Sequence, residues 1–529
     1  MPQQEATGTI DRHAKPLMEL LARAVDPPGA GVTPAGREIR VREITDDSRR
    51  VTPGACFVAI QGTRADGARF IADAVARGAV AVVTDRDCIV PAPAVKVLVA
   101  DARRAMARLA AVQLGLADLN WADAPGAIRR LRVIGVTGTN GKSTTVFLIR
   151  AILQAAGEPT ALLGTIQYDL LSRQVEAPMT TPPARTLVEY LVSAAEAGAT
   201  HAVMETSSHA LDQRRTDGIR FDAAVFTNLT GDHMDYHKTR EAYRLAKRRL
   251  FDLLDADATG IVNADDPAGD SMLEACGGRH MRFGLNGRAE LSACIREISA
   301  AGSCFDLVSE GRRVPIRLKL VGRHNVQNAL AAAAAARAVG VDWPAIVTGL
   351  ESVDSVRGRL EPVRAAGVQA PFTVLVDYAH TDDALENVLG ALRPLAPRKL
   401  IVVFGCGGDR DRLKRPRMAA VAERWADRIV VTSDNPRSEK PTDIIEEILT
   451  GFSQAAREKV HVQPDRRRAI HEAIVGAQPG DVVLLAGKGH ETYQDLGDHR
   501  IHFDDAEVAA EALAAAVGAR RTQGESTQE

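Results

Sequence analysis

The sequence predicts an α/β protein of three domains with mainly parallel sheets. The chain has 529 residues, and length alone suggests about three or four domains at roughly 150 residues each. In two regions, short runs of β-branched residues alternate with longer helical patterns, which is typical of βαβ units. Composition shifts near residues 122–127 and 352–358 indicate domains at 1–128, 129–355 and 356–529, with flexible ends at 1–15 and 520–529.

The expected strands indicate where ligands should bind. In the central region they are 132–137, 201–206, 222–227 and 260–263, and in the last region 373–376, 399–404, 428–432 and 481–486. The first region has shorter runs and is expected to form a smaller α/β domain, with strands at 55–60, 79–84 and 95–99. Parallel sheets bind ligands beyond the carboxyl ends of their strands, so the polar residues that follow these runs are the first candidates.

The composition argues against several classes of function. The 66 basic and 68 acidic residues give a net charge of −2, whereas nucleic-acid and membrane-surface binders need a basic field. Six scattered cysteines without a C-x-x-C pair predict reduced thiols, not a zinc site or a disulfide framework. The polar N-terminus lacks the apolar core of a signal peptide, and the alanine-rich stretch 330–341 is too short to span a bilayer. We expect a soluble, cytoplasmic monomer that is not inserted in a membrane and binds no nucleic acid.

The strongest single motif is GVTGTNGKSTT at residues 135–145, where a strand runs into a glycine-rich turn and then into a helix. Backbone N–H groups of such a loop surround phosphate oxygens. Lys142 is expected to reach the β- and γ-phosphates, and Ser143 or Thr144 to face Mg²⁺. The usual spacing would place a glycine at Val136. A tight strand–helix turn is the structural alternative, but such a turn does not require Lys-Ser-Thr after its last glycine.

Acidic and imidazole groups follow the neighbouring expected strands. Glu205 ends the run HAVME, where its carboxylate would face the phosphate loop, although a lone Glu at a strand end is more often solvated. The segment 227–237, TNLTGDHMDYH, adds two aspartates and two histidines, among them His233. Zinc is disfavoured because no cysteine is near. The loop is therefore expected to support a magnesium–nucleotide site.

Taken in order, the motifs GVTGTNGKSTT, METSSHAL, FTNLTGDHMDYH, GRHNVQNALAA, RGRLEPV and DYAHTDDAL resemble those of the Mur ligases of peptidoglycan precursor synthesis. The later segments FGCGGDRDRLKRP, SDNPRSEKP and AGKGHE are similar to those of the members that add the third peptide residue to UDP-MurNAc-L-Ala-D-Glu. The resemblance implies a small N-terminal UDP-binding domain, a central P-loop ATPase-type domain and a C-terminal Rossmann-like domain that binds the amino acid.

The resemblance further implies an ATP-dependent amide ligase that uses ATP and Mg²⁺. ATP phosphorylates the D-Glu carboxylate, the incoming amine attacks the acyl phosphate, and ADP and phosphate are released. Such a reaction depends on charge neutralisation and on the alignment of two anions. The catalytic positions carried over from the family are Lys142, Glu205, His233 and Lys247. The metal positions are Ser143, Thr144, Glu205, His233 and Lys247.

Lys247 has two different interpretations. On sequence physics alone it lies on a charged, solvated helix face in the segment LAKRRLF. By resemblance, the lysine of an A-K-x-x-L-F-like segment is carbamylated, which turns a cation into a carboxylate-like anion that positions Mg²⁺. An unmodified ammonium at this place would oppose the metal.

The resemblance also supplies binding positions for the two nucleotides. For ATP they are Gly138, Thr139, Asn140, Gly141, Lys142, Ser143, Thr144, Asn325, Arg359 and Asp377. For the UDP-MurNAc-dipeptide they are Ser48, Thr63, Arg64, Ala65, Thr180, Thr181, Ser207, Gln213 and Arg215. Asp46 and Met179 depart from the family pattern beside two of these segments. Taken singly, a helix cap at Asn325, a linker surface charge at Arg359 and a strand-end cap at Asp377 are the structural alternatives.

The identity of the added amino acid depends on the D-N-P-R segment at residues 434–437. meso-Diaminopimelate carries a second carboxylate, which Arg437 can bind bidentately while Pro436 restricts the turn. By resemblance, the complete motif indicates diaminopimelate specificity, and Glu491 suits the distal ammonium. The expected pocket consists of Arg410, Asp434, Asn435, Pro436, Arg437, Gly487 and Glu491. An ordinary Asn-Pro turn with a solvated arginine is the structural alternative.

Three competing functions remain to be distinguished. They are the same reaction with L-lysine, another amide ligase of this fold such as the D-Glu adder, the dipeptide adder or a folylpolyglutamate synthetase, and a nucleotide-binding scaffold without catalysis. The D-N-P-R and G-K-G-H-E segments argue against the other ligases. Intact Lys142, Glu205, His233 and Lys247 argue against the scaffold, since a degenerate site would be expected to lose at least one of them.

Overall fold

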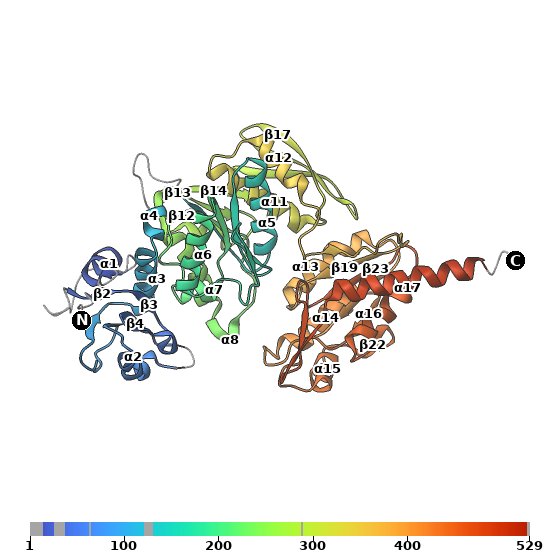
Figure 1. Ribbon diagram of the computed structural model, residues 1–529. Coiled ribbons are helices and arrows are strands. Elements are labelled where there is room, and N and C mark those ends of the chain that lie inside the picture. Colours follow the sequence, from blue (N-terminus) through green and yellow to red (C-terminus); the bar gives the residue numbers. More distant parts are fainter. Residues whose placement is uncertain (1–13, 26–37, 63–64, 121–130, 287–288, 526–529) are drawn as a thin grey trace, which may run out of the picture.

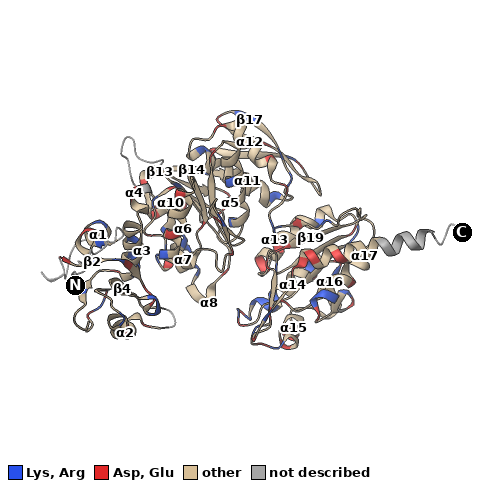
Figure 2. Ribbon diagram, in the orientation of Figure 1, with Lys and Arg blue, Asp and Glu red and all other residues tan. Residues whose placement is uncertain are grey.

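Three large sheets follow one another along the chain in the computed structural model, which describes residues 14–25, 38–62, 65–120, 131–286 and 289–525. Two two-stranded antiparallel sheets add to them, β1 (Lys15–Pro16) with β2 (Arg40–Val41) and β24 (Tyr493–Asp495) with β25 (Arg500–His502). Figure 1 shows the three large sheets in succession from the N-terminal part to the C-terminal part. Figure 2 shows Lys and Arg interspersed with Asp and Glu over all three parts, in agreement with the near-neutral net charge. Within the described ranges, no helix has the length and apolar character of a membrane span.

The N-terminal part contains a four-stranded parallel sheet. Its strands are β3 (Glu43–Thr45), β4 (Ala55–Ala59), β5 (Ala81–Thr84) and β6 (Val95–Leu98). Helices α1 (Leu17–Ala24) and α3 (Ala102–Gln113) pack together in the core on one face. The three strands expected in this region correspond to β4, β5 and β6. The expected boundary near 122–127 lies outside the described residues.

The central sheet has eleven strands in the order β10-β9-β8-β11-β7-β12-β13-β14-β15-β16-β17. The run from β8 to β15 is parallel, and both edges are antiparallel. Listed along the chain, the strands are β7 (Arg132–Thr137), β8 (Thr160–Leu163), β9 (Tyr168–Asp169), β10 (Gln174–Val175), β11 (His201–Glu205), β12 (Phe221–Phe226), β13 (Leu254–Asn263), β14 (Arg279–Gly284), β15 (Leu291–Ser299), β16 (Gly302–Ser309) and β17 (Arg312–Leu318).

The antiparallel extension from β15 to β17 was not expected from the sequence. Exposed and buried positions alternate in parts of β15 and β17, so neither strand has the continuous apolar run of a buried parallel strand. β17 also contains Pro315, and a proline normally argues against a strand. Because β17 is the edge strand of the sheet, the missing proline N–H can be tolerated there.

Helices cover both faces of the central sheet. On one face, α5 (Lys142–Ala155), α11 (Arg323–Ala338) and α12 (Trp343–Ser352) share a core with the sheet. The run of alanines in α11 is fully buried, which allows α11 and α5 to pack closely. On the other face, α6 (Ala184–Glu196) and α9 (Arg240–Asp252) share a second core. Because these helices cover the faces of the sheet, the carboxyl ends of its parallel strands stay accessible to a ligand.

The C-terminal sheet has six strands in the order β18-β19-β23-β20-β21-β22, all parallel except β18. The strands are β18 (Glu361–Pro362), β19 (Thr373–Asp377), β20 (Leu400–Phe404), β21 (Arg428–Val431), β22 (Val460–Val462) and β23 (Val482–Ala486). Helices α13 (Asp382–Leu392), α14 (Lys414–Trp425) and α15 (Pro441–Leu449) cover one face. Helices α16 (Arg466–Val475) and α17 (Asp505–Glu525) cover the other. This two-sided arrangement agrees with the expected α/β class.

Flexibility was expected at both chain ends. At the C-terminal end, α17 is helical as far as Glu525, and the expected flexibility of residues 520–529 stays a prediction. Most of the expected flexible lead, residues 1–13, lies outside the described residues, as do 526–529.

Candidate active site

The glycine-rich loop between β7 and α5 needs its glycines at the positions where they occur. Gly141 has φ +85° directly before α5. Gly138 has φ +148°, and a Cβ there would lie 1.9 Å from Thr227 Oγ1. Side chains other than glycine would therefore be strained or clash at these places. In this loop the close approach to Thr227 is at residue 138, so a glycine is required there. The usual spacing would have placed a glycine at residue 136.

A cavity of about 440 Å³ opens at this loop and is called here the phosphate-loop cavity. Most positions predicted to bind ATP line it, namely Thr139, Asn140, Gly141, Lys142, Ser143, Thr144, Asn325, Arg359 and Asp377. Glu205 and His233 line it as well. Gly138 does not line the cavity, but its carbonyl accepts hydrogen bonds from two lysines. The structure thus gathers residues from the central and C-terminal sheets around the loop.

Lys142 folds back onto its own loop. Its Nζ donates to the carbonyl oxygens of Gly138, at 2.9 Å, and Thr139, at 2.8 Å. Burial lowers the pKa of Lys142, while Glu205 and Asp232 act in the opposite direction. A lysine held by carbonyl oxygens at a helix N-terminus is poised to exchange those contacts for phosphate oxygens.

Three of the predicted ATP-binding positions, Asn325, Arg359 and Asp377, are held by different partners. Asn325 donates from Nδ2 to Val321 O at 2.9 Å. The Arg359 guanidinium donates to Ser143 Oγ at 3.0 Å and lies over the Tyr378 ring, so it stands at the phosphate end of the cavity. Asp377 accepts from the backbone N–H groups of Leu360 and Ala379, and burial raises its pKa.

Glu205 lies beside the phosphate loop because β11 and β7 are parallel neighbours, with Glu205 in register with Val136. The carboxylate is 1% exposed and accepts from Thr165, with N–H to Oε1 at 2.8 Å and Oγ1–H to Oε2 at 3.0 Å. Each carboxylate oxygen keeps a further lone pair. Glu205 is therefore a fixed oxygen donor at the cavity wall.

His233 comes from the loop after β12 and begins the short helix α8 (Met234–His237), with φ +56°. Its Nε2 lies 3.4 Å from Asp232 Oδ2, and burial lowers its pKa to about 4 despite this carboxylate. A neutral imidazole can bind a metal ion. His237, from the same loop, is instead buried with Nε2 2.9 Å from Ser208 Oγ.

The donors around the loop suit a magnesium–nucleotide complex. In the described part of the chain, no group of three or more His, Cys, Asp and Glu side chains could hold a metal ion by itself. Mg²⁺ at a nucleotide site is normally held by one or two protein groups together with phosphate oxygens and water. One carboxylate at Glu205 and the hydroxyls of Ser143 and Thr144, all lining one cavity, fit that pattern.

Lys247 is buried, and the interpretation of a solvated helix face is wrong. The side chain is 1% exposed on α9, its Nζ donates to Gly138 O at 2.7 Å, and it lies 4.3 Å from the centroid of the Tyr243 ring. Burial lowers the pKa of Lys247 well below its ordinary value, and the nearby Lys142 lowers it further. The environment under the phosphate loop therefore disfavours the ammonium form of Lys247.

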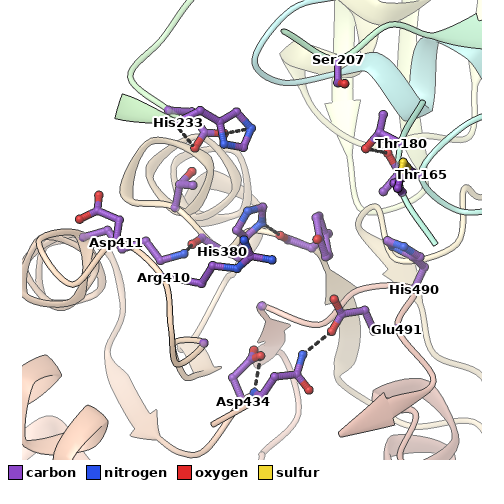
Figure 3. A pocket seen from close by; sticks show the side chains of 18 of the residues that line it. Thr165, Thr180, Ser207, His233, His380, Arg410, Asp411, Asp434, His490 and Glu491 are labelled. Carbon is purple, nitrogen blue, oxygen red and sulfur yellow. Dashed lines mark hydrogen bonds and ion pairs between the residues drawn. The ribbon is translucent and has the colours of Figure 1, made fainter. Parts of the chain in front are cut away.

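A second cavity of about 910 Å³ adjoins the first and is called here the D-N-P-R cavity. Seven residues line both cavities, so they form a shared wall: Thr165, Thr180, Asp232, His233, Tyr378, His380 and Thr381. Figure 3 shows this region, with His233, Thr165 and Thr180 above and Asp434 and Glu491 below. A ligand in one cavity can therefore meet a ligand in the other.

The predicted diaminopimelate positions lie in the lower part of this cavity. Arg410, Asp434, Asn435, Arg437, Gly487 and Glu491 line it, whereas Pro436 does not. Asn435 Nδ2 donates to Glu491 Oε2 at 2.8 Å. Arg437 has φ +51° and donates to Gly408 O at 2.7 Å. The motif thus presents a fixed guanidinium and a carboxylate to the same space.

A buried lysine supports this pocket and was not singled out from the sequence. Lys488 is fully buried and donates to Glu491 Oε2 and to Asn435 Oδ1, both at 3.3 Å. Burial acts to raise the pKa of Asp434, but Lys488 and Arg466 lower it below its ordinary value. Burial and the nearby Asp434 raise the pKa of Glu491. Lys488 lies within the recognised G-K-G-H-E segment, but the segment does not indicate which residues Lys488 contacts.

The predicted muramoyl-dipeptide positions occupy the upper part of the cavity. Thr180, Thr181, Ser207 and Arg215 line it. Arg215 donates to Thr181 O at 2.9 Å and to Gln213 Oε1 at 2.7 Å, so Gln213 orients Arg215 from outside the lining. A guanidinium held in this way can face a carboxylate or a phosphate.

Ser48 and Ala65, two further positions predicted for the UDP-MurNAc-dipeptide, belong to the N-terminal part. Ser48 is in the 3₁₀ turn Ser48–Arg50 of the N-terminal part and is 8% exposed. Neither Ser48 nor Ala65 lines either cavity, and Thr63 and Arg64 lie outside the described residues. Arg185 joins the two parts by donating to Ile44 O at 2.7 Å.

Besides Asp377, two further residues of the DYAHTDDAL segment belong to the site but were not predicted from the sequence. Asp383 joins the two sheets, because its Oδ2 accepts from Asn140 Nδ2 at 2.7 Å and from Thr230 Oγ1 at 2.8 Å. His380 lines both cavities. The sequence contained both residues within a recognised motif, but their contacts depend on how α13 meets the phosphate loop.

Comparisons with known proteins agree with this architecture. Three family models match: "Mur ligase family, catalytic domain" at residues 40–113, "Mur ligase middle domain" at 136–336 and "Mur ligase, glutamate ligase domain" at 358–489. A relative from Solibacter usitatus, UDP-N-acetylmuramoyl-L-alanyl-D-glutamate–2,6-diaminopimelate ligase, is 43% identical over 485 residues, covering 91% of this chain and 95% of that protein. A ligase of the same name from Thermosynechococcus vestitus is 43% identical over 502 residues, with 94% and 97% covered.

A solved structure gives the same result. A structure of UDP-N-acetylmuramoyl-L-alanyl-D-glutamate–2,6-diaminopimelate ligase aligns with a TM-score of 0.65 at 34% identity, covering 90% of this chain and 95% of that one. The match spans nearly the whole of both chains. The chain belongs to the Mur ligase family.

Proposed function

We propose that this protein is an ATP-dependent ligase that adds meso-2,6-diaminopimelate to UDP-MurNAc-L-Ala-D-Glu in the cytoplasm, through an acyl phosphate and with release of ADP and phosphate. The observation that carries the proposal is the shared wall between the phosphate-loop cavity and the D-N-P-R cavity. Such a wall is where a γ-phosphoryl group, a carboxylate and an amine could meet.

The residues around the phosphate loop would bind ATP and offset its charge. The backbone N–H groups at the start of α5 and the Lys142 ammonium would face the β- and γ-phosphates. Ser143, Thr144, Glu205 and His233 would hold Mg²⁺, which when bound would neutralise phosphate charge. The repulsion between the phosphate and the D-Glu carboxylate is the main barrier that these groups would lower.

Lys247 would contribute to this site as a carbamate. Burial lowers the pKa of this amine, which favours the uncharged form, and only an uncharged amine has the lone pair that bonds to the carbon of CO₂. Loss of one proton from nitrogen then leaves an anionic carbamate. The change replaces a potential positive charge beside Lys142 with a negative one, which favours a bound cation.

The D-N-P-R cavity would select the amino acid. Arg437 and Arg410 offer guanidinium groups for the distal carboxylate, and Glu491 offers a carboxylate for the distal ammonium. L-Lysine has the distal ammonium but lacks the distal carboxylate, so it would leave a guanidinium without its partner. The pocket therefore favours diaminopimelate over lysine.

Phosphate release tests the proposal directly. The full chain would be assayed with ATP, Mg²⁺ and UDP-MurNAc-L-Ala-D-Glu, and with either meso-diaminopimelate or L-lysine. We expect release that depends on all substrates and on diaminopimelate. Release with L-lysine alone would reassign the amino acid, and no release with either would favour the scaffold.

A further inference from the structure

His380 is a candidate catalytic residue that none of the assigned binding positions includes. It lines both the phosphate-loop cavity and the D-N-P-R cavity. In sequence it lies between the end of β19 and Thr381, the N-cap residue of α13. If the proposed function holds, the acyl phosphate forms in one cavity and the amine arrives from the other. His380 is then beside the place where the new bond forms.

Its hydrogen bonds determine which ring nitrogen is available. Nδ1 lies 2.9 Å from Tyr378 O, and a carbonyl oxygen can only accept, so Nδ1 carries the hydrogen. In the neutral ring, Nε2 then has the free lone pair. The backbone is held as well, because Lys414 Nζ donates to His380 O at 2.8 Å, and the ring packs on Tyr378 with centroids 4.5 Å apart. Figure 3 shows the ring projecting into the cavity.

The surroundings keep this ring uncharged before ligands bind. Burial lowers the pKa of His380 to about 4, and two cations act in the same direction, Lys414 on α14 and Arg359 before β18. The N-terminus of α13 also disfavours an imidazolium. Asp232, from the loop before α8, and the Tyr378 carbonyl act in the opposite direction. His490 is a further imidazole near the ring.

We propose that His380 Nε2 accepts the proton that the amino group of diaminopimelate loses before it attacks the acyl phosphate. The ammonium gives one proton to Nε2, and the nitrogen lone pair then bonds to the acyl carbon. The tetrahedral intermediate collapses, the C–O bond to phosphate breaks, and phosphate leaves with its electron pair. The second proton on nitrogen passes to the departing phosphate, and the imidazolium releases its proton to water. The products are the amide, hydrogen phosphate and one proton.

The substrates themselves supply the charge that this transfer needs. Acyl phosphate and the carboxylates of both substrates are anions that would bind close to the ring. Anions at this distance favour the imidazolium and raise the pKa of a histidine toward the operating range. His380 is thus an uncharged lone-pair donor in the free protein and a stronger base once the site is filled.

Hydroxylamine separates this role from the first half of the reaction. It attacks acyl phosphates as an uncharged nucleophile, so hydroxamate formation reports the acyl phosphate without needing a base for the amine. The full-length His380→Gln variant should form hydroxamate from ATP and UDP-MurNAc-L-Ala-D-Glu at the wild-type rate. Its kcat with diaminopimelate should fall about 10²-fold or more. That rate should recover with rising pH, as diaminopimelate itself loses the proton. The His380→Asn variant, which retains a donor toward Tyr378 O, should give the same results as His380→Gln in both assays.

The control and the contrary outcomes are distinct. His471→Gln changes an exposed histidine on α16, outside both cavities, and should leave both assays unchanged. Equal losses of hydroxamate and amide in the His380 variants would overturn the proton-acceptor role, and so would an unchanged kcat with diaminopimelate. Absence of hydroxamate with the wild-type protein would instead contradict the acyl phosphate on which the inference rests.

Discussion

The two adjoining cavities handle buried charge in different ways. At the phosphate loop, Lys142 and Lys247 both donate to the carbonyl of Gly138, and burial lowers the pKa of each. Behind the wall of the D-N-P-R cavity, Lys488 donates to the Glu491 carboxylate, and Arg466, which lowers the pKa of Asp434, forms a fully buried ion pair with Asp505. A buried lysine that is bonded only to carbonyl oxygens is stabilised most by a ligand anion, which binds and then leaves. A buried lysine or arginine that is paired with a carboxylate instead belongs to a fixed recognition surface. The first cavity therefore suits transient charge, and the second suits selection.

Removal of the loop lysine should have the largest effect. We expect Lys142→Ala to lower kcat/KM by about 10²–10³-fold, because a preorganised cation at the transferring phosphoryl group is lost. Steady-state phosphate release measures the change. Lys399→Ala, at an exposed position, serves as the matched control. A loss of less than about tenfold would contradict the role of Lys142 at the γ-phosphate.

Removal of the second lysine should also be severe but should be reversible in part. We expect Lys247→Ala to lower kcat by about 10²-fold, since the carbamate anion is lost. Acetate or another short carboxylate, added to the assay, should restore part of the activity by occupying the space. Lys142→Ala should show no such rescue, because it loses a cation. Full activity of Lys247→Ala without acetate would exclude the carbamate.

A change in the D-N-P-R cavity should affect one substrate only. We expect Arg437→Ala to raise KM for diaminopimelate by about 10- to 10²-fold, which is the effect of one charged hydrogen-bond pair. KM for ATP should stay the same, because Arg437 does not line the phosphate-loop cavity. Arg437→Lys should recover little, since a lysine cannot bind a carboxylate bidentately. An unchanged KM for diaminopimelate would make the pocket assignment wrong.

The contact between the two sheets should have the smallest effect. Asp383→Ala removes the acceptor for Asn140 and Thr230. We expect KM for ATP to rise about fivefold, equivalent to about 1 kcal/mol for lost hydrogen bonds. Glu386→Gln, on the same helix but paired with Arg424 within the C-terminal part, is the matched control. Equal effects of the two changes would show that Asp383 acts only on the stability of α13.

Much of the fold could be predicted from local patterns. The strands beside the site are buried apolar runs, and the structure places β7, β11, β12 and β19 within a few residues of the expected ranges. The antiparallel strands β15 and β17 could not be predicted in the same way, because both are partly exposed and β17 is the edge strand of the central sheet. The strand between them, β16, is largely buried and was missed. Local patterns report burial, and an edge strand has too little of it.

The candidate site likewise has a part that could be predicted from local patterns and a part that could not. Residues 138–144 form a continuous motif, so their place at a strand–helix turn follows from sequence. The contact of Thr165 with Glu205, and that of Asp383 with Asn140, join residues far apart in the chain. No spacing rule connects such pairs. They depend on the register of β11 against β8 and on how α13 approaches the loop.

Local residue order was enough to place a phosphate loop, a buried strand before it and a guanidinium in a D-N-P-R turn, because each depends on neighbouring residues and their backbone angles. The charge states of the buried site residues depend on tertiary packing and not on local residue order. Lys247 became a buried amine, and His380 acquired a free Nε2, only when α9, α13 and α14 packed around the carboxyl ends of the strands. Desolvation depends on every atom nearby in space, and tertiary packing alone determines which atoms those are.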